Sequence, residues 1–468
     1  MITNYAKDPL APFHTPGHRF GKALEASGGW FKKISRLDLT EIPALDWEKA
    51  LQEAESLAAD FYGADECIFL VQGASQGIIG GIVGVFNPGD TVLAARNCHC
   101  SVIQGLVLAD LQPVFIEADY IVGWGLAAAP KLEAVKKAIR ENPGFKGLII
   151  TNPTYQGVAG CVDVYRELIG ERLLMIDEAH GGYLGWSGYE RVDARLAADL
   201  WVQGTHKMLG SLTQTGILHL RKGRLDPYRV REGLEILTTT SPSYILLASL
   251  DLNRCFLATR GSRMFGEAPK ALGELKQQLL ELKRIRVLTG ACLNHPAQVV
   301  DPWKLTISFQ DLGFSGYEAE RLLRTEFGIC AEYADLYQVT FFIPPWQKEA
   351  DIKKLGRAVK SISGRIMSAP EKSGYPTFGP EPQAISLPRV VMRPRAALLS
   401  PAKKMVPLRE AVGRVAGVSI FPYPPGIPLL VPGELIRDSE IETIEAILGQ
   451  GGMVRGVAPS GEIPVVDI

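Results

Sequence analysis

Short apolar runs alternate with longer helical patterns through the first half of the chain. The runs are rich in Val, Ile and Leu and lie at residues 67–71, 91–95, 113–117, 147–151, 173–177, 200–203 and 216–220. Strands that are buried on both faces read as near-continuous apolar runs, and helices between such strands cover both faces of a mostly parallel sheet. The pattern therefore predicts an α/β domain built on a mostly parallel seven-stranded sheet.

The pattern changes after this domain. Leucines spaced among charged residues predict a helix over residues 267–287, and strand-like runs follow at 304–309 and 339–343, which favours a smaller α+β domain. A later stretch with four prolines, two glycines and little apolar content is typical of a linker. The expected units are an N-terminal arm (1–47), the sheet domain (48–265), the α+β domain (266–367), the linker (368–383) and a C-terminal domain (384–468).

Charge and composition exclude several classes of partner. The chain has 468 residues, and its 50 Lys and Arg against 51 Asp and Glu give a net charge of −1, so it lacks the basic field that would hold nucleic acid or an anionic membrane surface. The longest apolar stretch, residues 78–86, is far shorter than the roughly 20 residues of a membrane span, and residues 1–17 lack the apolar core of a signal peptide. Seven scattered cysteines are typical of reduced thiols. We therefore expect a cytoplasmic enzyme that binds a small molecule.

Two patterns resemble metal-binding motifs, but neither predicts a metal site. Residues 98–100 read Cys-His-Cys, yet no second pair of ligands follows at a usable spacing. His14 and His18 have the spacing of two ligands on one helix, but a proline and a glycine lie between them and disfavour that helix. No metal is expected.

The first of four polar segments that follow predicted strands is a turn of small residues, at 72–77. It contains Ala74, Ser75 and Gln76 and precedes an apolar helix. Backbone amides at the start of a helix bind phosphate, and a serine hydroxyl adds a further donor. The turn is equally compatible with an ordinary connection between a strand and a helix.

The second segment places His99 just after the strand at 91–95. An imidazole at this position could lie flat on a conjugated ring, although a lone histidine is more often structural. The third segment ends the strand at 173–177 in Asp177, and a buried carboxylate needs a cation or several hydrogen bonds. Residues 177–180 also spell the DEAH of certain nucleic-acid helicases, but the phosphate loop GxxxxGKS or GxxxxGKT that such a function needs is absent from the sequence.

The fourth segment contains Lys207, directly after the strand at 200–203. Apolar residues flank this lysine on both sides. A lysine held away from water has a lowered pKa, which makes it a nucleophile toward carbonyl compounds. A surface lysine is the competing interpretation, and the apolar neighbours disfavour it.

The order of these four segments resembles the fold-type I enzymes that depend on pyridoxal phosphate (PLP), which share the aspartate aminotransferase fold. Within them, the sequence is most similar to the Orn/Lys/Arg decarboxylase family. The motifs that carry this resemblance lie at residues 13–18, 96–99, 151–157, 177–180, 205–207 and 423–428, in a fixed order that covers nearly the whole chain. The resemblance implies a PLP-dependent large domain, a small α+β domain and the C-terminal domain of that family.

The resemblance also implies a role for each candidate residue. Lys207 would carry PLP, Asp177 would pair with its pyridine nitrogen, His99 would stack on its ring, His180 would line the other side, and Ser75 would hold the phosphate with the amides of Ala74 and Gln76 and with His206. Two departures weaken the phosphate assignment, because Gly204 and Ala74 stand where the family often has hydroxyl residues. The chain also lacks the N-terminal regulatory wing of the large members, which puts their decameric assembly in doubt.

The implied activity is decarboxylation of a basic amino acid, arginine before lysine or ornithine, to a polyamine precursor and CO2. The alternatives are a fold-type I aminotransferase or aldolase, and a non-catalytic homologue that binds PLP or a polyamine. Glu41, Asp46 and Glu434 are candidate partners for the distal cation of the substrate, although each could as well be a cap or a surface charge. We further expect a homodimer, or a multiple of it, because the arm at 13–18 is too rich in proline and glycine to form a core element of its own.

Overall fold

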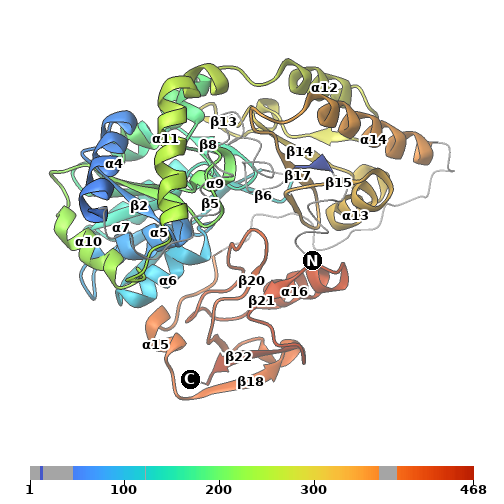
Figure 1. Cartoon of the computed structure of the whole chain (residues 1–468). Coiled ribbons are helices and arrows are strands. Elements are labelled where there is room, and N and C mark those ends of the chain that lie inside the picture. The colour runs from blue at the N-terminus through green and yellow to red at the C-terminus, as the bar shows by residue number, and fades with distance from the viewer. Residues whose placement is uncertain (1–10, 14–45, 122, 368–386, 468) are drawn as a thin grey trace.

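A computed structural model describes residues 11–13, 46–121, 123–367 and 387–467. Its large domain contains the predicted sheet of seven strands, in the order β2–β11–β10–β9–β7–β3–β4 (Figure 1). All neighbouring pairs are parallel except those of β11, which is antiparallel to both β10 and β2. The strands are β2 (Glu66–Leu70), β3 (Thr91–Ala95), β4 (Gln112–Ile116), β7 (Gly147–Thr151), β9 (Leu173–Asp177), β10 (Leu200–Gln203) and β11 (Gly216–Leu220). The predicted fold class is confirmed.

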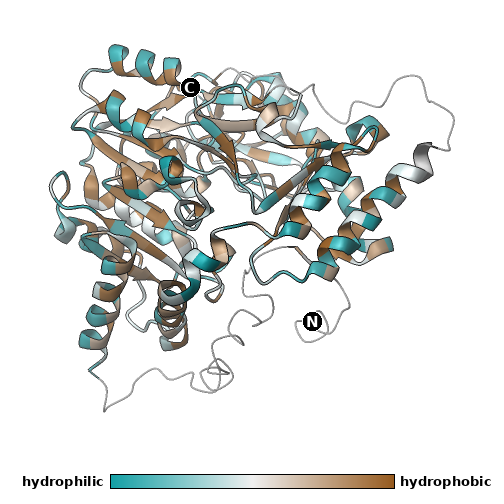
Figure 2. Cartoon of the chain, turned by 90° about the horizontal axis from the view of Figure 1, so that it is seen from above, coloured by the Kyte–Doolittle hydropathy of each residue, from teal (hydrophilic) through white to brown (hydrophobic). Residues whose placement is uncertain are grey.

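Helices cover both faces of this sheet, as the apolar runs predicted. Successive side chains of a strand point to opposite faces, and in β3 Val92 and Ala94 join one buried cluster while Leu93 and Ala95 join another. The strands are mostly brown in Figure 2, whereas the helices around them alternate between brown and teal. The first cluster involves α5 (Gly73–Val85), α6 (Cys100–Leu108) and α10 (Pro227–Glu235), and the second involves α7 (Leu132–Glu141) and α8 (Val162–Ile169).

Further elements extend the large domain. The helices α4 (Trp47–Tyr62) and α11 (Tyr244–Phe265) pack against each other, and a β-hairpin is formed by β5 (Ala118–Ile121) and β6 (Leu126–Pro130). A short strand, β8 (Val158–Gly160), pairs antiparallel with β13 (Gln298–Val300), which follows the large domain in sequence. Within the described part of the chain, every helix is too short or too polar to span a bilayer.

The small domain has a four-stranded antiparallel sheet in the order β12–β14–β17–β16. The predicted helix over 267–287 is too long, because α12 ends at Leu280. Arg284 then adopts a left-handed conformation (φ 64°) that a helix cannot continue, and the next residues form β12. The elements are α12 (Lys270–Leu280), β12 (Arg286–Val287), β14 (Lys304–Ser308), α13 (Gly316–Phe327), β16 (Tyr333–Ala334), β17 (Val339–Phe342) and α14 (Glu349–Met367).

The start of the chain contributes to this small domain. The strand β1 (Ala11–Pro12) pairs in parallel with β15 (Ile329–Cys330). Phe13 is fully buried in the core of the small domain, with its ring edge-on to Phe341 at a centroid distance of 5.6 Å. The sequence predicted that the segment 13–18 forms no core element of its own, and Phe13 nevertheless contributes one aromatic side chain to the core of the small domain. Residues 14–18 lie outside the described residues.

The C-terminal segment has a core of its own and packs beneath the other two domains in Figure 1. Its elements are α15 (Pro394–Leu398), β18 (Lys403–Pro407), β19 (Val415–Ala416), β20 (Phe421–Pro422), α16 (Asp438–Gly449), β21 (Val454–Arg455) and β22 (Glu462–Val466). Three of the strands form an antiparallel sheet in the order β18–β22–β19. The linker at 368–383 lies outside the described residues, and the domain boundaries drawn from the sequence stay a prediction.

Candidate active site

The candidate residues gather at the carboxyl ends of the parallel strands. Asp177 is the last residue of β9. Lys207 lies in α9 (Thr205–Met208), and a single residue separates this helix from the end of β10. His99 follows β3, and the turn with Ser75 follows β2. Because the carboxyl ends of parallel strands meet at one edge of a sheet, four segments far apart in the sequence form one site.

The amine of Lys207 contacts the imidazole of His180. The distance from Lys207 Nζ to His180 Nε2 is 2.7 Å. While Lys207 is an ammonium ion it can only donate, so in that state Nε2 accepts and the proton of the neutral ring is assigned to Nδ1. Burial, followed by the charge of Lys207, lowers the pKa of His180 well below its usual value, which keeps the ring neutral. His180 Nδ1 is buried and has no hydrogen-bond partner in the structure.

Burial also lowers the pKa of Lys207, to about 8. The carboxylates of Asp177 and Glu332 oppose this shift, and the charge of Lys304 adds to it. At pH 7 about one molecule in ten would then carry a neutral amine, compared with about one in 3,000 for an ordinary lysine. Lys207 is therefore prepared to act as a nucleophile.

The reactivity of Lys207 toward an acylating reagent should consequently rise up to about pH 8 and level off above it. Competitive labelling with acetic anhydride, read by peptide mass spectrometry on the cofactor-free protein, measures this profile. Lys270 is a suitable internal control, because its side chain is 91% exposed. If the labelling of Lys207 kept rising to pH 10, the lowered pKa would be wrong.

Asp177 is a buried carboxylate that lacks a cation. Its side chain is 3% exposed and accepts a hydrogen bond from the Ala179 amide (3.1 Å), and among the described residues no Lys, Arg or His forms an ion pair with it. Burial raises its pKa, while the charge of Lys207 and the Ala179 amide oppose the rise. An unpaired buried carboxylate is costly, and the described residues supply no ion-pair partner that would offset this cost.

His99 is a neutral ring held in a fixed orientation. It begins α6, and its Nδ1 accepts a hydrogen bond from the Ser101 amide (3.2 Å), which places the proton on Nε2. Burial, with the charge of Lys207, lowers its pKa to about 4. Gly426 of the C-terminal domain packs against the ring so closely that a Cβ there would lie 2.8 Å from Nε2, and its carbonyl accepts from the Cys100 amide at 2.9 Å.

The small-residue turn forms the first turn of α5. Gln72, which precedes the helix, makes no side-chain cap, so the first amides of the helix are not satisfied in that way. Both ends of the Gln76 side chain already form hydrogen bonds within the chain. Its Oε1 accepts from the Gln72 amide (3.2 Å), and its Nε2 donates to Thr238 (2.6 Å). Ala74, Ser75 and Gln76 would therefore offer an anion mainly backbone N–H groups. His206 donates from Nδ1 to the Thr215 carbonyl at 2.7 Å.

Two models of one protein family match this chain. The Orn/Lys/Arg decarboxylase major domain matches residues 1–351, and the C-terminal domain of the same family matches residues 381–448. The chain belongs to the Orn/Lys/Arg decarboxylase family. It is accordingly a decarboxylase of a basic amino acid, and the alternatives of an aminotransferase, an aldolase or a non-catalytic binding protein are set aside.

Several known proteins are similar to this decarboxylase over most of its length. It is 35% identical to an arginine decarboxylase of Bacillus subtilis, over 97% of this chain and 94% of that protein. It is 25% identical to the constitutive lysine decarboxylase of Escherichia coli, over 96% of this chain and 76% of that protein. Its fold matches a lysine decarboxylase of Francisella novicida with a TM-score of 0.77 at 20% identity, over 99% of this chain and 80% of that one. A cysteine desulfurase of Thermococcus onnurineus shares the fold more distantly, with a TM-score of 0.54 at 15% identity, over 77% of this chain and 94% of that one.

The decarboxylase site includes polar residues that sequence reasoning missed. The hydroxyl of Tyr155 donates to Glu332 at 2.5 Å, and its ring packs on His180 at 4.5 Å between centroids. Lys304 is fully buried, 3.5 Å from Asp301 and 3.4 Å from the His180 carbonyl. The sequence does carry a signal for Lys304, since a lysine at the start of an otherwise apolar strand is unusual.

Glu434 is paired within the chain. Its carboxylate is fully buried and receives two hydrogen bonds from Arg96, at 3.0 and 2.9 Å, and one from the Val431 amide at 2.7 Å. Arg96 also donates to the carbonyls of Pro428 and Leu429. Asp46 caps α4 by accepting from the Lys49 amide, and Glu41 lies outside the described residues. Glu434 is already neutralised by Arg96, and its candidacy as a partner of the substrate stays a prediction.

Replacing Arg96 with methionine should destabilise the decarboxylase by about 3–5 kcal/mol, since the buried charge of Glu434 would lose its partner. Denaturant unfolding followed by circular dichroism measures the change. Arg409→Met provides the matched control, because the Arg409–Glu445 pair is exposed and should contribute at most about 1 kcal/mol. Equal effects of the two substitutions would contradict a special role for the buried pair.

Proposed function

We propose that this chain is a PLP-dependent arginine decarboxylase in which Lys207 carries the cofactor. The assignment of the site rests on Asp177, a buried carboxylate that forms no ion pair with the described residues. Asp177 ends β9, and β9 pairs with β10, the strand that precedes the low-pKa Lys207. The preference for arginine rests on the 35% identity to an arginine decarboxylase over nearly the full length of both chains. The seven cysteines are free thiols, which is compatible with a cytoplasmic location.

The residues present fit PLP. A protonated pyridine nitrogen would give Asp177 the cation that it lacks, and the buried Nδ1–H of His180 would find an acceptor on the cofactor or the substrate. The first turn of α5, with Ala74, Ser75 and Gln76, would hold the phosphate through its amides, helped by His206. His99 would stack on one face of the ring.

The residues of this chain would divide the work of decarboxylation. When bound, PLP supplies a conjugated ring that accepts the electron pair left behind as CO2 departs. Asp177 would hold a proton on the ring nitrogen and so would make the ring a stronger acceptor. Lys207 reacts in its neutral form, and His180 Nε2 receives a hydrogen bond from its amine. His99 and the backbone around Gly426 exclude water from one side.

The substrate assignment is tested with purified holoenzyme that is offered arginine, lysine and ornithine separately. We expect CO2 release from arginine at a kcat/KM at least tenfold above that for lysine or ornithine. A higher kcat/KM for lysine than for arginine would overturn the assignment of arginine as the substrate, but it would not affect the assignment of the chain as a decarboxylase.

We further propose that the enzyme works as a homodimer, or a multiple of it, whose active site takes residues from both subunits. The proposal rests on the resemblance of the N-terminal motif at 13–18 to that of the family, a segment of which the structure describes only Phe13. Light scattering should give at least a dimer at assay concentration. Mixing Lys207→Ala subunits with His18→Ala subunits should restore part of the activity, whereas a fully active monomer would refute the shared site.

A further inference from the structure

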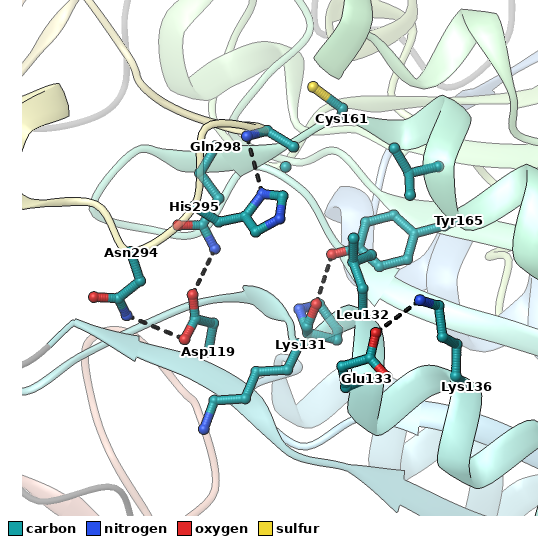
Figure 3. A pocket seen from close by; sticks show the side chains of 14 residues that line it. Asp119, Lys131, Leu132, Glu133, Lys136, Cys161, Tyr165, Asn294, His295 and Gln298 are labelled. Carbon is teal, nitrogen blue, oxygen red and sulfur yellow. Dashed lines mark hydrogen bonds and ion pairs between the residues drawn. The ribbon is translucent and has the colours of Figure 1, made fainter.

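A cavity of about 430 Å³, whose lining includes none of the candidate active-site residues, lies between the β5–β6 hairpin and the segment that leads into β13 (Figure 3). Its lining includes Asp119 from β5, Tyr165 from α8, and Asn294, His295 and Gln298 from the opposite segment. None of these residues has a role in the decarboxylation proposed above.

Asp119 is the buried charge of this cavity. Its residue is 8% exposed, and its two carboxylate oxygens accept hydrogen bonds from Asn294 Nδ2 (3.1 Å) and Gln298 Nε2 (2.9 Å). Both donors are neutral amides, and no Lys, Arg or His within the described ranges forms an ion pair with Asp119. A buried carboxylate that only neutral amides satisfy has no counter-ion, so a cation bound beside it would be attracted.

The other charges around the cavity do not neutralise Asp119. Lys136 pairs with Glu133 at 2.7 Å, and the ammonium of Lys131 pairs with Glu117 at 3.2 Å. His295 accepts at Nδ1 from the Ala297 amide (3.0 Å). The negative charge of the cavity is therefore concentrated on Asp119.

Two further features suit an organic cation that has several N–H groups. The Oε1 atom of Gln298 is buried and accepts no hydrogen bond, so it offers an acceptor beside the carboxylate. The rings of Tyr165 and His295 border the same space (Figure 3), and an aromatic face attracts a cation. The phenol of Tyr165 donates to the Pro130 carbonyl at 2.8 Å, which fixes that ring in place.

We propose that this cavity is a second binding site, separate from the active site, for a small alkylguanidinium or alkylammonium ion. Asp119 is the counter-ion, Gln298 Oε1 is an additional acceptor, and Tyr165 is the aromatic wall. The cavity volume exceeds that of such an ion and reaches the range of small-molecule sites.

The site is tested with butylguanidinium, which has no primary amine to react with PLP, and with its neutral isostere butylurea. Isothermal titration of the holoenzyme should show saturable binding of butylguanidinium but not of butylurea, with no change in the absorbance of the cofactor. Asp119→Asn should weaken that binding by about thirtyfold or more, since a charge pair loses one partner. Glu133→Gln is the matched control, because it removes a carboxylate of the same cavity that is already paired, and it should leave the affinity within twofold.

Three results would overturn the proposal: no binding to the wild-type holoenzyme, equal binding of butylurea, or an unchanged affinity in Asp119→Asn. Thermal unfolding of both variants checks that they are folded. Should Asp119→Asn be unstable, Gln298→Leu, which removes the additional acceptor of this cavity alone, should weaken the binding of butylguanidinium, and an unchanged affinity in that variant would overturn the proposal.

Discussion

Lys207→Ala should lower turnover below detection and remove the covalent PLP adduct that borohydride reduction traps in the wild-type enzyme. A methyl group can neither attack a carbonyl carbon nor exchange a proton with His180. Intact-mass and peptide mass spectrometry after borohydride reduction measure the adduct and its position. The loss should be complete rather than partial, because the nucleophile itself is removed.

Lys276→Met is the matched control for this experiment. Burial lowers the pKa of Lys276 to about 8 as well, but this lysine donates to the Pro302 carbonyl in the small domain. The control should keep both the adduct and most of the activity, because a low pKa without the strand-end position does not make an active site. An adduct that persisted in Lys207→Ala at another lysine would refute the assignment.

Asp177→Asn should leave the enzyme folded and able to bind PLP but slow decarboxylation by several orders of magnitude. A neutral amide no longer holds the proton on the ring nitrogen, so the ring becomes a weaker electron acceptor. Single-turnover release of CO2 from arginine measures the chemical step directly, apart from binding and product release.

The stability of the cofactor-free protein separates this role from a structural one. Because Asp177 is a buried carboxylate that forms no ion pair with the described residues, the neutral asparagine should leave the apoprotein at least as stable as the wild type. A structural carboxylate would give the opposite result. Near-normal turnover in Asp177→Asn, or a marked loss of apoprotein stability, would contradict the proposed role.

Most of the large domain could be predicted from the sequence because its strands are buried on both faces. The runs at 91–95, 147–151, 173–177, 200–203 and 216–220 have the same bounds in the structure. Lys207, His180, Asp177 and His99 could be placed together for the same reason, since each follows such a strand. Position at a strand end is a local signal, and local signals can be read from one sequence.

Contacts between distant segments could not be predicted in this way. The two-residue and three-residue strands β1, β8, β13 and β15 are too short to give a periodic pattern. Arg96 and Glu434 were both visible as charges, but nothing in the composition indicated that they pair across 338 positions. Glu332, which contacts Tyr155, lies between two short strands. Its place beside the candidate site could not be predicted either, because such short strands give no periodic pattern.

The pairing of β1 with β15 also constrains how the chain can assemble. Ala11 pairs with Ile329, so almost the entire large domain and much of the small domain are synthesised between two strands that must meet. Closing so long a loop is slow and costs entropy, so this contact should form late, after the large domain has folded. A fragment of residues 266–367 would have a hole where Phe13 belongs, at a cost of the order of 3–5 kcal/mol. The small domain is therefore compact in space but discontinuous in sequence. It is complete only after the early strand β1 has paired with the late strand β15.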